Sequence, residues 1–119
     1  EISRAAKKLS AGGHLIVLSP AHQWVFSALD IAVGHFRRYS RSTLTNLAPK
    51  GPKLVRVRYL DSAGLLASLG NRLVLKSSLP TLRQILFWDR FMVPFSRILD
   101  PLLAYQVGKS ILVVWQKSA

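Results

Sequence analysis

The sequence contains no cysteine, which excludes disulfide bonds and thiolate metal sites. It is also poor in acid, with 5 Asp+Glu against 17 Lys+Arg and a formal net charge of +12. No run of about 18 apolar residues is present, which argues against a membrane-spanning helix, and the first residues lack a signal-peptide pattern. These absences favour a cytoplasmic protein that is at most peripheral to a membrane.

The residues that are present predict one domain with a modest core. The chain has 119 residues, of which 50% are hydrophobic, so a disordered chain is not expected. The charge predicts attraction to polyanions such as nucleic acid, anionic lipid or a phosphorylated substrate. The charge alone does not choose among these partners.

Three segments predict β-strands and an order for them. His14–Pro20 and Ser110–Gln116 are continuous apolar runs, typical of strands buried on both faces. Leu54–Leu60 alternates apolar residues with arginines, which suits an edge strand. The last strand should therefore lie between the other two. The first would then be an exposed apolar edge, so we expect missing strands on its N-terminal side or a homodimer mate paired through residues 14–18.

Two short helices are predicted before the second strand. Ile2 to Leu9 has helical spacing and is stopped by Gly12-Gly13, with no capping residue before it, as if the chain began inside a helix of a larger domain. A second helix is predicted near Ser42 to Ala48, capped by Ser40 or Ser42.

Residues 61–106 predict a long helical region. Interruptions are expected near Gly70-Asn71, at Leu79-Pro80, at Pro94 and at Asp100-Pro101. Within it, "LRQILFWDRFMVPFSRIL" carries an arginine every seven residues, at Arg83, Arg90 and Arg97. Such a stripe opposite apolar residues suits a helix in a membrane interface. The commoner alternative, which we expect here, is a core-packed helix with a solvated arginine face.

Three stretches together resemble a known family. They are "LSAGGHLIVLSPAHQWVFSALDIAVGHFRRYSRSTLTNL", "VRVRY" and "VGKSILVVWQK". The chain resembles the C-terminal half of a class I S-adenosylmethionine-dependent methyltransferase, of the bacterial kind with a Gly-His-x-Arg-Arg-Tyr loop. The resemblance implies an α/β fold: a partial Rossmann-like sheet with equivalents of strands 5, 6 and 7 in the order 5-7-6, the last antiparallel, with flanking helices. Residues 1–119 would be a single partial domain with a helical insertion at about 61–106.

The resemblance also implies an activity, the transfer of a methyl group to a small or lipid-linked acceptor. The family's cofactor site needs a glycine-rich turn after the first strand of the fold and an acid after the second. Here Gly12-Gly13 precedes a strand, and no acid is suitably placed. We therefore assign no residue to S-adenosylmethionine. We expect the isolated chain to be inactive and to need the missing N-terminal half.

The candidate acceptor site lies where the first strand ends, because open parallel sheets bind ligands at the carboxyl ends of strands. His22 leaves the strand there, and the loop "GHFRRY" follows. His35 is a candidate general base, since imidazole side chains titrate near neutral pH. Arg37 and Arg38 are candidates to bind a carboxylate or phosphate with forked hydrogen bonds, and Tyr39 is a candidate to close the pocket.

Structural roles are open for the same residues. His35 would then fix loop geometry, one arginine would point to solvent or pair with Asp30, and Tyr39 would belong to the core. The three histidines show no metal-binding spacing, so no metal is expected.

Two alternatives involve no catalysis. One is a membrane-surface module that binds through residues 82–99. The other is a nucleic-acid-binding module, with Phe36 and Tyr39 available to stack on bases. Its basic residues would be Arg37, Arg38, Arg41, Lys50, Lys53, Arg56 and Arg58.

Overall fold

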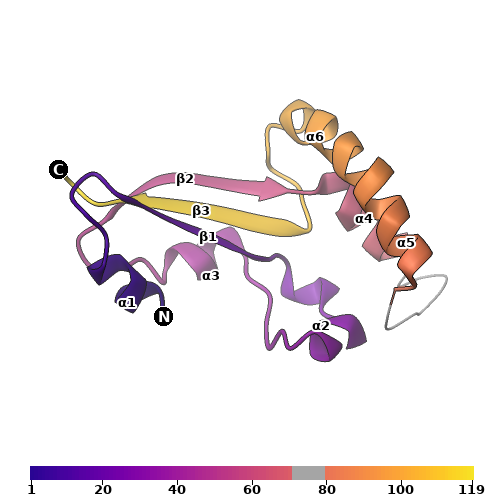
Figure 1. Cartoon of the computed structure of the whole chain (residues 1–119), viewed down its shortest axis with the longest axis horizontal. Coiled ribbons are helices and arrows are strands. Elements are labelled where there is room, and N and C mark those ends of the chain that lie inside the picture. The colour runs from indigo at the N-terminus through magenta and orange to yellow at the C-terminus, as the bar shows by residue number, and fades with distance from the viewer. Residues whose placement is uncertain (71–79) are drawn as a thin grey trace.

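A computed structural model describes residues 1–70 and 80–119, which form a three-stranded sheet flanked by helices (Figure 1). The elements in chain order are α1 (Ile2–Lys7), β1 (His14–Pro20), η1 (Gln23–Val25), α2 (Ala28–Ala32), α3 (Arg41–Thr45), β2 (Lys53–Leu60), α4 (Ser62–Gly70), α5 (Leu82–Phe87), the π turn η3 (Trp88–Met92), α6 (Val93–Leu102) and β3 (Ser110–Gln116).

The strand order is β1-β3-β2, and β3 is antiparallel to both of its neighbours. β1 and β2 therefore run parallel to each other, with the last strand of the chain between them. The α/β class, this order and the direction of the last strand were all predicted from the sequence and are confirmed. Side chains alternate between the two faces of a strand, so each face of this sheet has its own character.

One face of the sheet carries the core. Ile111, Val113 and Trp115 of β3 are fully buried there. Leu44 of α3 packs on them, and Ile2 of α1 covers the cluster from the chain's N-terminus. The helices that lie on this face therefore determine which face of the sheet is buried.

The opposite face is open in the described part of the chain. Ile16 is 63% exposed and Leu18 is 61% exposed, although they pair with Val114 and Leu112 of β3. The prediction that β1 is buried on both faces is therefore wrong for this structure, because its covering helices all lie on the other face. β1 is also an edge of the described sheet, with no strand on its outer side.

The short helix after the GHFRRY loop is confirmed, with bounds that differ by a few residues. α3 starts at Arg41, and Ser40 is its cap, since the Ser40 hydroxyl accepts a hydrogen bond from the Thr43 N–H at 3.2 Å. The Thr43 hydroxyl returns the bond, accepting from the Ser40 N–H at 2.7 Å. This reciprocal pair sets where the helix begins.

The region after β2 departs from the prediction at its prolines. Residues 82–102 are one continuous helix, α5 through η3 to α6, so the breaks expected at Pro94 and Asp100-Pro101 are wrong. The π turn η3 ends at Met92, two residues before Pro94, and such a turn relaxes the hydrogen-bond ladder where a proline cannot donate. The expected breaks at Gly70-Asn71 and Leu79-Pro80 include residues outside the described part.

Candidate functional site

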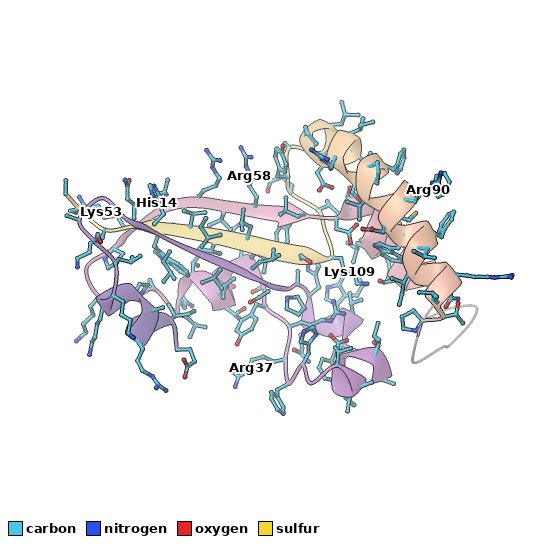
Figure 2. All side chains as sticks on the ribbon, in the orientation of Figure 1. His14, Arg37, Lys53, Arg58, Arg90 and Lys109 are labelled. Atoms are coloured by element: carbon cyan, nitrogen blue, oxygen red, sulfur yellow. The ribbon has the colours of Figure 1, made fainter. Side chains whose placement is uncertain are left out.

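The carboxyl ends of β1 and β2 meet the start of β3 at one end of the sheet. The Ala21 N–H donates to the Lys109 carbonyl at 2.8 Å, and the Lys109 N–H donates to the Asp61 carbonyl at 3.1 Å. Figure 2 shows Lys109 at this end, near the helices that follow β2. We name His22, Tyr59, Asp61 and Lys109 the strand-end cluster. It lies at the carboxyl ends of the two outer strands, β1 and β2.

His22 holds a strained position in this cluster. Its φ is 63°, a left-handed conformation that is uncommon for a residue other than glycine and is often found at functional sites. Its ring stacks on Tyr59, with centroids 4.9 Å apart and planes 15° apart. Within the described residues, the buried Nε2 atom has no hydrogen-bond partner. This nitrogen is unsatisfied within the described residues but is fully buried, so the lack of a partner does not by itself offer a binding position.

The surroundings of His22 favour its neutral form. Burial lowers its pKa, the charge of Arg38 lowers it further, and the backbone of Gly108 counteracts part of the effect. A neutral imidazole accepts a proton or a hydrogen bond at one nitrogen. His22, which the sequence analysis placed among the substrate-binding residues, therefore has the properties of a proton acceptor.

Lys109 is a member of the cluster that sequence reasoning missed. Burial lowers the pKa of its ammonium group, Asp61 raises it in part, and Arg38 again lowers it. The Nζ atom lies 4.7 Å from the centroid of the Trp88 ring, a distance typical of a cation–π contact. The only sequence signal was its place between Gly108 and an apolar strand, which puts it at the sheet end once β3 is antiparallel.

The acids of this region are already bonded within the protein. The Asp100 carboxylate accepts from the Asp61 N–H at 2.8 Å and from the Ser62 N–H at 2.9 Å. The Asp61 carboxylate accepts from the Gly64 N–H at 2.9 Å and from the Ser96 hydroxyl at 2.8 Å. These bonds cap α4 and tie α6 to it, so the two carboxylates serve the fold.

Arg38 ties the GHFRRY loop to the sheet. Its Nε donates to Asp30 Oδ1 at 2.9 Å and its guanidinium donates to the Ala21 carbonyl at 3.1 Å, with only 8% of the residue exposed. Burial by itself raises the pKa of Asp30, but hydrogen bonds from Arg38 and Ser27 outweigh this and hold the pKa below its ordinary value. Arg38 therefore pairs with Asp30, one of the structural roles left open by the sequence.

The other candidates of the loop are placed differently. His35 is half exposed, and its Nδ1 lies 3.5 Å from Asp30 Oδ1, so His35 and Arg38 share one carboxylate. Tyr39 packs against the core, while its backbone bonds to Pro20 and His22 at 2.9 Å each. Arg37 is exposed and points away from the sheet (Figure 2).

The predicted set thus divides in two. His22, Arg38 and Tyr39 come together at the end of β1, and His35 joins them through Asp30, whereas Arg37 stands apart. Among residues 1–70 and 80–119, no three His, Asp or Glu side chains gather in a way that could hold a metal ion. No helix of this part is long and apolar enough to cross a membrane.

Comparison with known proteins adds no assignment. No family model, curated protein or solved structure matches this chain. The described end of the sheet holds a neutral imidazole, His22, and a partly buried lysine, Lys109. Such a set is suited to holding an anionic molecule and taking a proton from it.

Proposed function

We propose that this chain is the acceptor-side half of an S-adenosylmethionine-dependent methyltransferase that acts on a small or lipid-linked acceptor. The observation that supports the proposal is the sheet: two parallel strands with the last strand antiparallel between them. This is the arrangement that the sequence resemblance implied for strands 5, 7 and 6. The strand-end cluster lies where such a sheet binds its ligands.

The described residues do not fit the cofactor. The turn at Gly12 lies before β1, and its N–H donates to the Lys117 carbonyl at 3.0 Å, beyond the end of β3. It is therefore at the opposite end of the sheet from His22. No glycine-rich turn follows a strand in the part of the chain that the structure describes. On this proposal the cofactor residues belong to the missing half, and this chain binds the acceptor.

The strand-end cluster defines what this chain contributes. Lys109 supplies positive charge that attracts an acceptor with a carboxylate or phosphate group, while Arg38 stays bonded to Asp30. His22 takes the proton that an oxygen or nitrogen acceptor loses as it gains the methyl group, and the proton then rests on the imidazole ring. His35, which contacts Asp30, is the second candidate for this proton.

The open side of the sheet supports a missing half. The apolar face of Ile16 and Leu18 continues to the free edge of β1. The radius of gyration is 15.9 Å, against about 13.5 Å expected for a compact domain of this length. On the proposal, further strands extend the sheet from β1 and their helices cover that face. A homodimer mate paired through residues 14–18 is the competing occupant.

Calorimetric titration with S-adenosylmethionine tests the proposal. The titration is carried out on this chain alone and on the complete product of its gene. We expect no heat of binding with the chain alone and saturable binding with the complete product. Binding to the chain alone would place the cofactor site within these residues and overturn the half-domain assignment. Absence of binding in both would overturn the methyltransferase assignment.

One observation favours a second candidate, a nucleic-acid-binding module. Phe36 is 93% exposed at the tip of the loop, next to the exposed Arg37, and exposed aromatic rings beside arginine suit stacking on unpaired bases. Fluorescence anisotropy with a single-stranded oligonucleotide at low and high salt tests it. This candidate predicts salt-sensitive binding that Phe36→Ala weakens, and binding indifferent to both changes would exclude it.

A further inference from the structure

The helix formed by α5, η3 and α6 packs with its polar side inward. In α6 the buried residues are Ser96 and Asp100, which are 3% and 5% exposed. Phe95, Ile98 and Leu102 are 54%, 66% and 76% exposed. An ordinary surface helix buries its apolar stripe and exposes its polar one. The core-packed helix expected from the sequence is therefore wrong, because α6 shows the reverse arrangement.

Hydrogen bonds explain the inward polar side. Ser96 and Asp100 meet the first turn of α4, where the Ser96 hydroxyl accepts from the Ala63 N–H at 3.2 Å and Asp100 accepts from the Ser62 N–H at 2.9 Å. Because these bonds satisfy the N-terminus of α4, they fix the rotation of α6. The apolar stripe is left on the outside as a result of this packing.

The exposed stripe forms a ridge along the helix. Phe95, Ile98 and Leu102 follow one another at intervals of three and four residues, which places them on one face. Phe91, one turn earlier, is 57% exposed and continues the same spacing. We name Phe91, Phe95, Ile98 and Leu102 the apolar ridge. Isolated exposed apolar residues are common, but a row of four marks an interaction surface.

Arginines flank the ridge. Arg83, Arg90 and Arg97 are all exposed, and Figure 2 shows Arg90 projecting from the helix away from the sheet. Residues 80–119 contain two acids, Asp89 and Asp100, and Asp100 is buried. The outer surface of this helix is therefore apolar and net positive. An apolar row beside arginines is the pattern of helices that lie in the interface of anionic membranes.

The proposed missing half does not account for this surface. Further strands would join the free edge of β1, whereas α6 packs against α4 and β2. Figure 1 shows α6 past the carboxyl end of β2, the strand at the opposite edge of the sheet from β1. The ridge thus needs an occupant of its own, independent of the methyltransferase proposal.

We propose that the apolar ridge docks on an anionic membrane surface. Its side chains insert at the boundary between headgroups and acyl chains, with the helix parallel to the membrane plane. Arg90 and Arg97, which are seven residues and so about two turns apart on one side, contact lipid phosphates. The flanking arginines are what select an anionic lipid surface over an uncharged apolar partner.

Cosedimentation with vesicles tests the docking. The full chain is mixed with phosphatidylcholine vesicles, with and without phosphatidylserine. We expect strong binding only with phosphatidylserine, weakened by added salt. Phe95→Ser with Ile98→Ser should lower the affinity by about tenfold or more. Arg90→Gln with Arg97→Gln should lower it by about tenfold, and only for the anionic vesicles.

Matched control variants distinguish docking through the apolar ridge from nonspecific vesicle binding. Ile31, 69% exposed on α2, and the exposed Arg37 supply them: Ile31→Ser and Arg37→Gln should leave vesicle binding within about twofold. Circular dichroism confirms that each variant keeps its fold. Equal binding to both vesicle types, or binding unchanged by the ridge variant, would overturn the proposal. So would arginine-dependent capture of an oligonucleotide without vesicle binding, or loss of self-association as the sole effect of the ridge variant.

Discussion

At the residue scale, the buried ion pair of Asp30 and Arg38 is the interaction of the GHFRRY loop whose loss we expect to reduce stability most. The side chains of Asp30 and Arg38 are 1% and 5% exposed, so removing the charge of Asp30 leaves a guanidinium buried without a counter-ion. We predict that Asp30→Asn lowers the free energy of unfolding by about 3 kcal/mol at neutral pH. Urea denaturation measures it, with the exposed Asp89→Asn as control. Equal midpoints for Asp30→Asn and wild type would contradict this role.

The same pair predicts a pH dependence. The folded state lowers the pKa of Asp30, so its contribution to stability is present above the unfolded pKa and is lost as pH falls through the folded value. Wild type should therefore lose stability below about pH 4. Asp30→Asn should lose less over the same acid range. If the free energy of unfolding fell equally with pH in the two proteins, Asp30 would not be responsible for the loss.

His22 predicts a second pH dependence, nearer neutrality. Its pKa is lowered mainly by burial, so protonation favours the unfolded chain and stability falls as pH drops below about 6.5 toward the folded pKa. We predict that His22→Asn flattens this decline, since Asn tolerates the positive φ of the site. Urea midpoints between about pH 5 and about pH 7 measure it. A wild-type slope in His22→Asn would show that His22 is not responsible for the decline.

At the element scale, the caps decide where helices begin. The sequence left Ser40 and Ser42 as alternatives for α3, and the structure places the accepting hydroxyl on Ser40. We predict that Ser40→Ala lowers the free energy of unfolding by about 1 kcal/mol and that Ser42→Ala lowers it by less. Thermal and urea unfolding of the two variants measure the difference. A larger loss at Ser42 would mean that the cap is assigned to the wrong serine.

The turn into β3 requires a glycine at position 108, because there is no room for a side chain. A Cβ on Gly108 would collide with the backbone of Leu60, whereas one on Gly70 would meet nothing within 4 Å. Backbone atoms cannot move aside as a side-chain tip can. We predict that Gly108→Ala lowers the free energy of unfolding by about 2 kcal/mol and that Gly70→Ala, at the end of α4, is neutral or slightly stabilising. Chemical denaturation compares them, and equal effects would refute the close approach.

At the scale of the whole molecule, the described sheet is covered on one face only. A sheet needs a packed layer against each apolar face, and the face of Ile16 and Leu18 has none in the described residues. We predict that the chain alone self-associates and that Ile16→Lys with Leu18→Lys reduces association at little cost in stability, because both side chains are more than half exposed. Sedimentation velocity measures the oligomer distribution. The matched control Ile31→Lys should leave it unchanged, and a monomeric wild type would contradict the prediction.

Local patterns predicted the strands well but misjudged what covers them. The bounds of His14–Pro20 and Ser110–Gln116 agree with the structure, because apolar runs between turn residues depend on short-range preferences. The predicted burial of the strand faces does not agree with the structure, because burial depends on which helices pack on the sheet. The prolines of α6 show the same limit. From the sequence, a proline is expected to break a helix. The π turn that lies before Pro94 and keeps the helix continuous could not be predicted from residue spacing alone.

Only some residues of the candidate site could be predicted from the sequence. Of the predicted set, the structure brings His22, Arg38 and Tyr39 together at the end of β1. His35 reaches them only through Asp30, and Arg37 stands apart. Lys109 was missed because it lies far along the chain, and it reaches Ala21 only once β3 pairs with β1. The pairing of Arg38 with Asp30 was one option among several until backbone geometry brought Nε within 2.9 Å of the carboxylate.

The sequence by itself determined the positive charge, the three strands and their order, because composition and alternating hydrophobicity are local properties. Only the tertiary structure decided which side chains share a site and which surface stays open. The strand-end cluster joins residues from three strand ends, and the outward ridge of α6 follows from hydrogen bonds of Ser96 and Asp100 to α4. Contacts between residues distant in the chain form only when the elements pack, so no local pattern determines them.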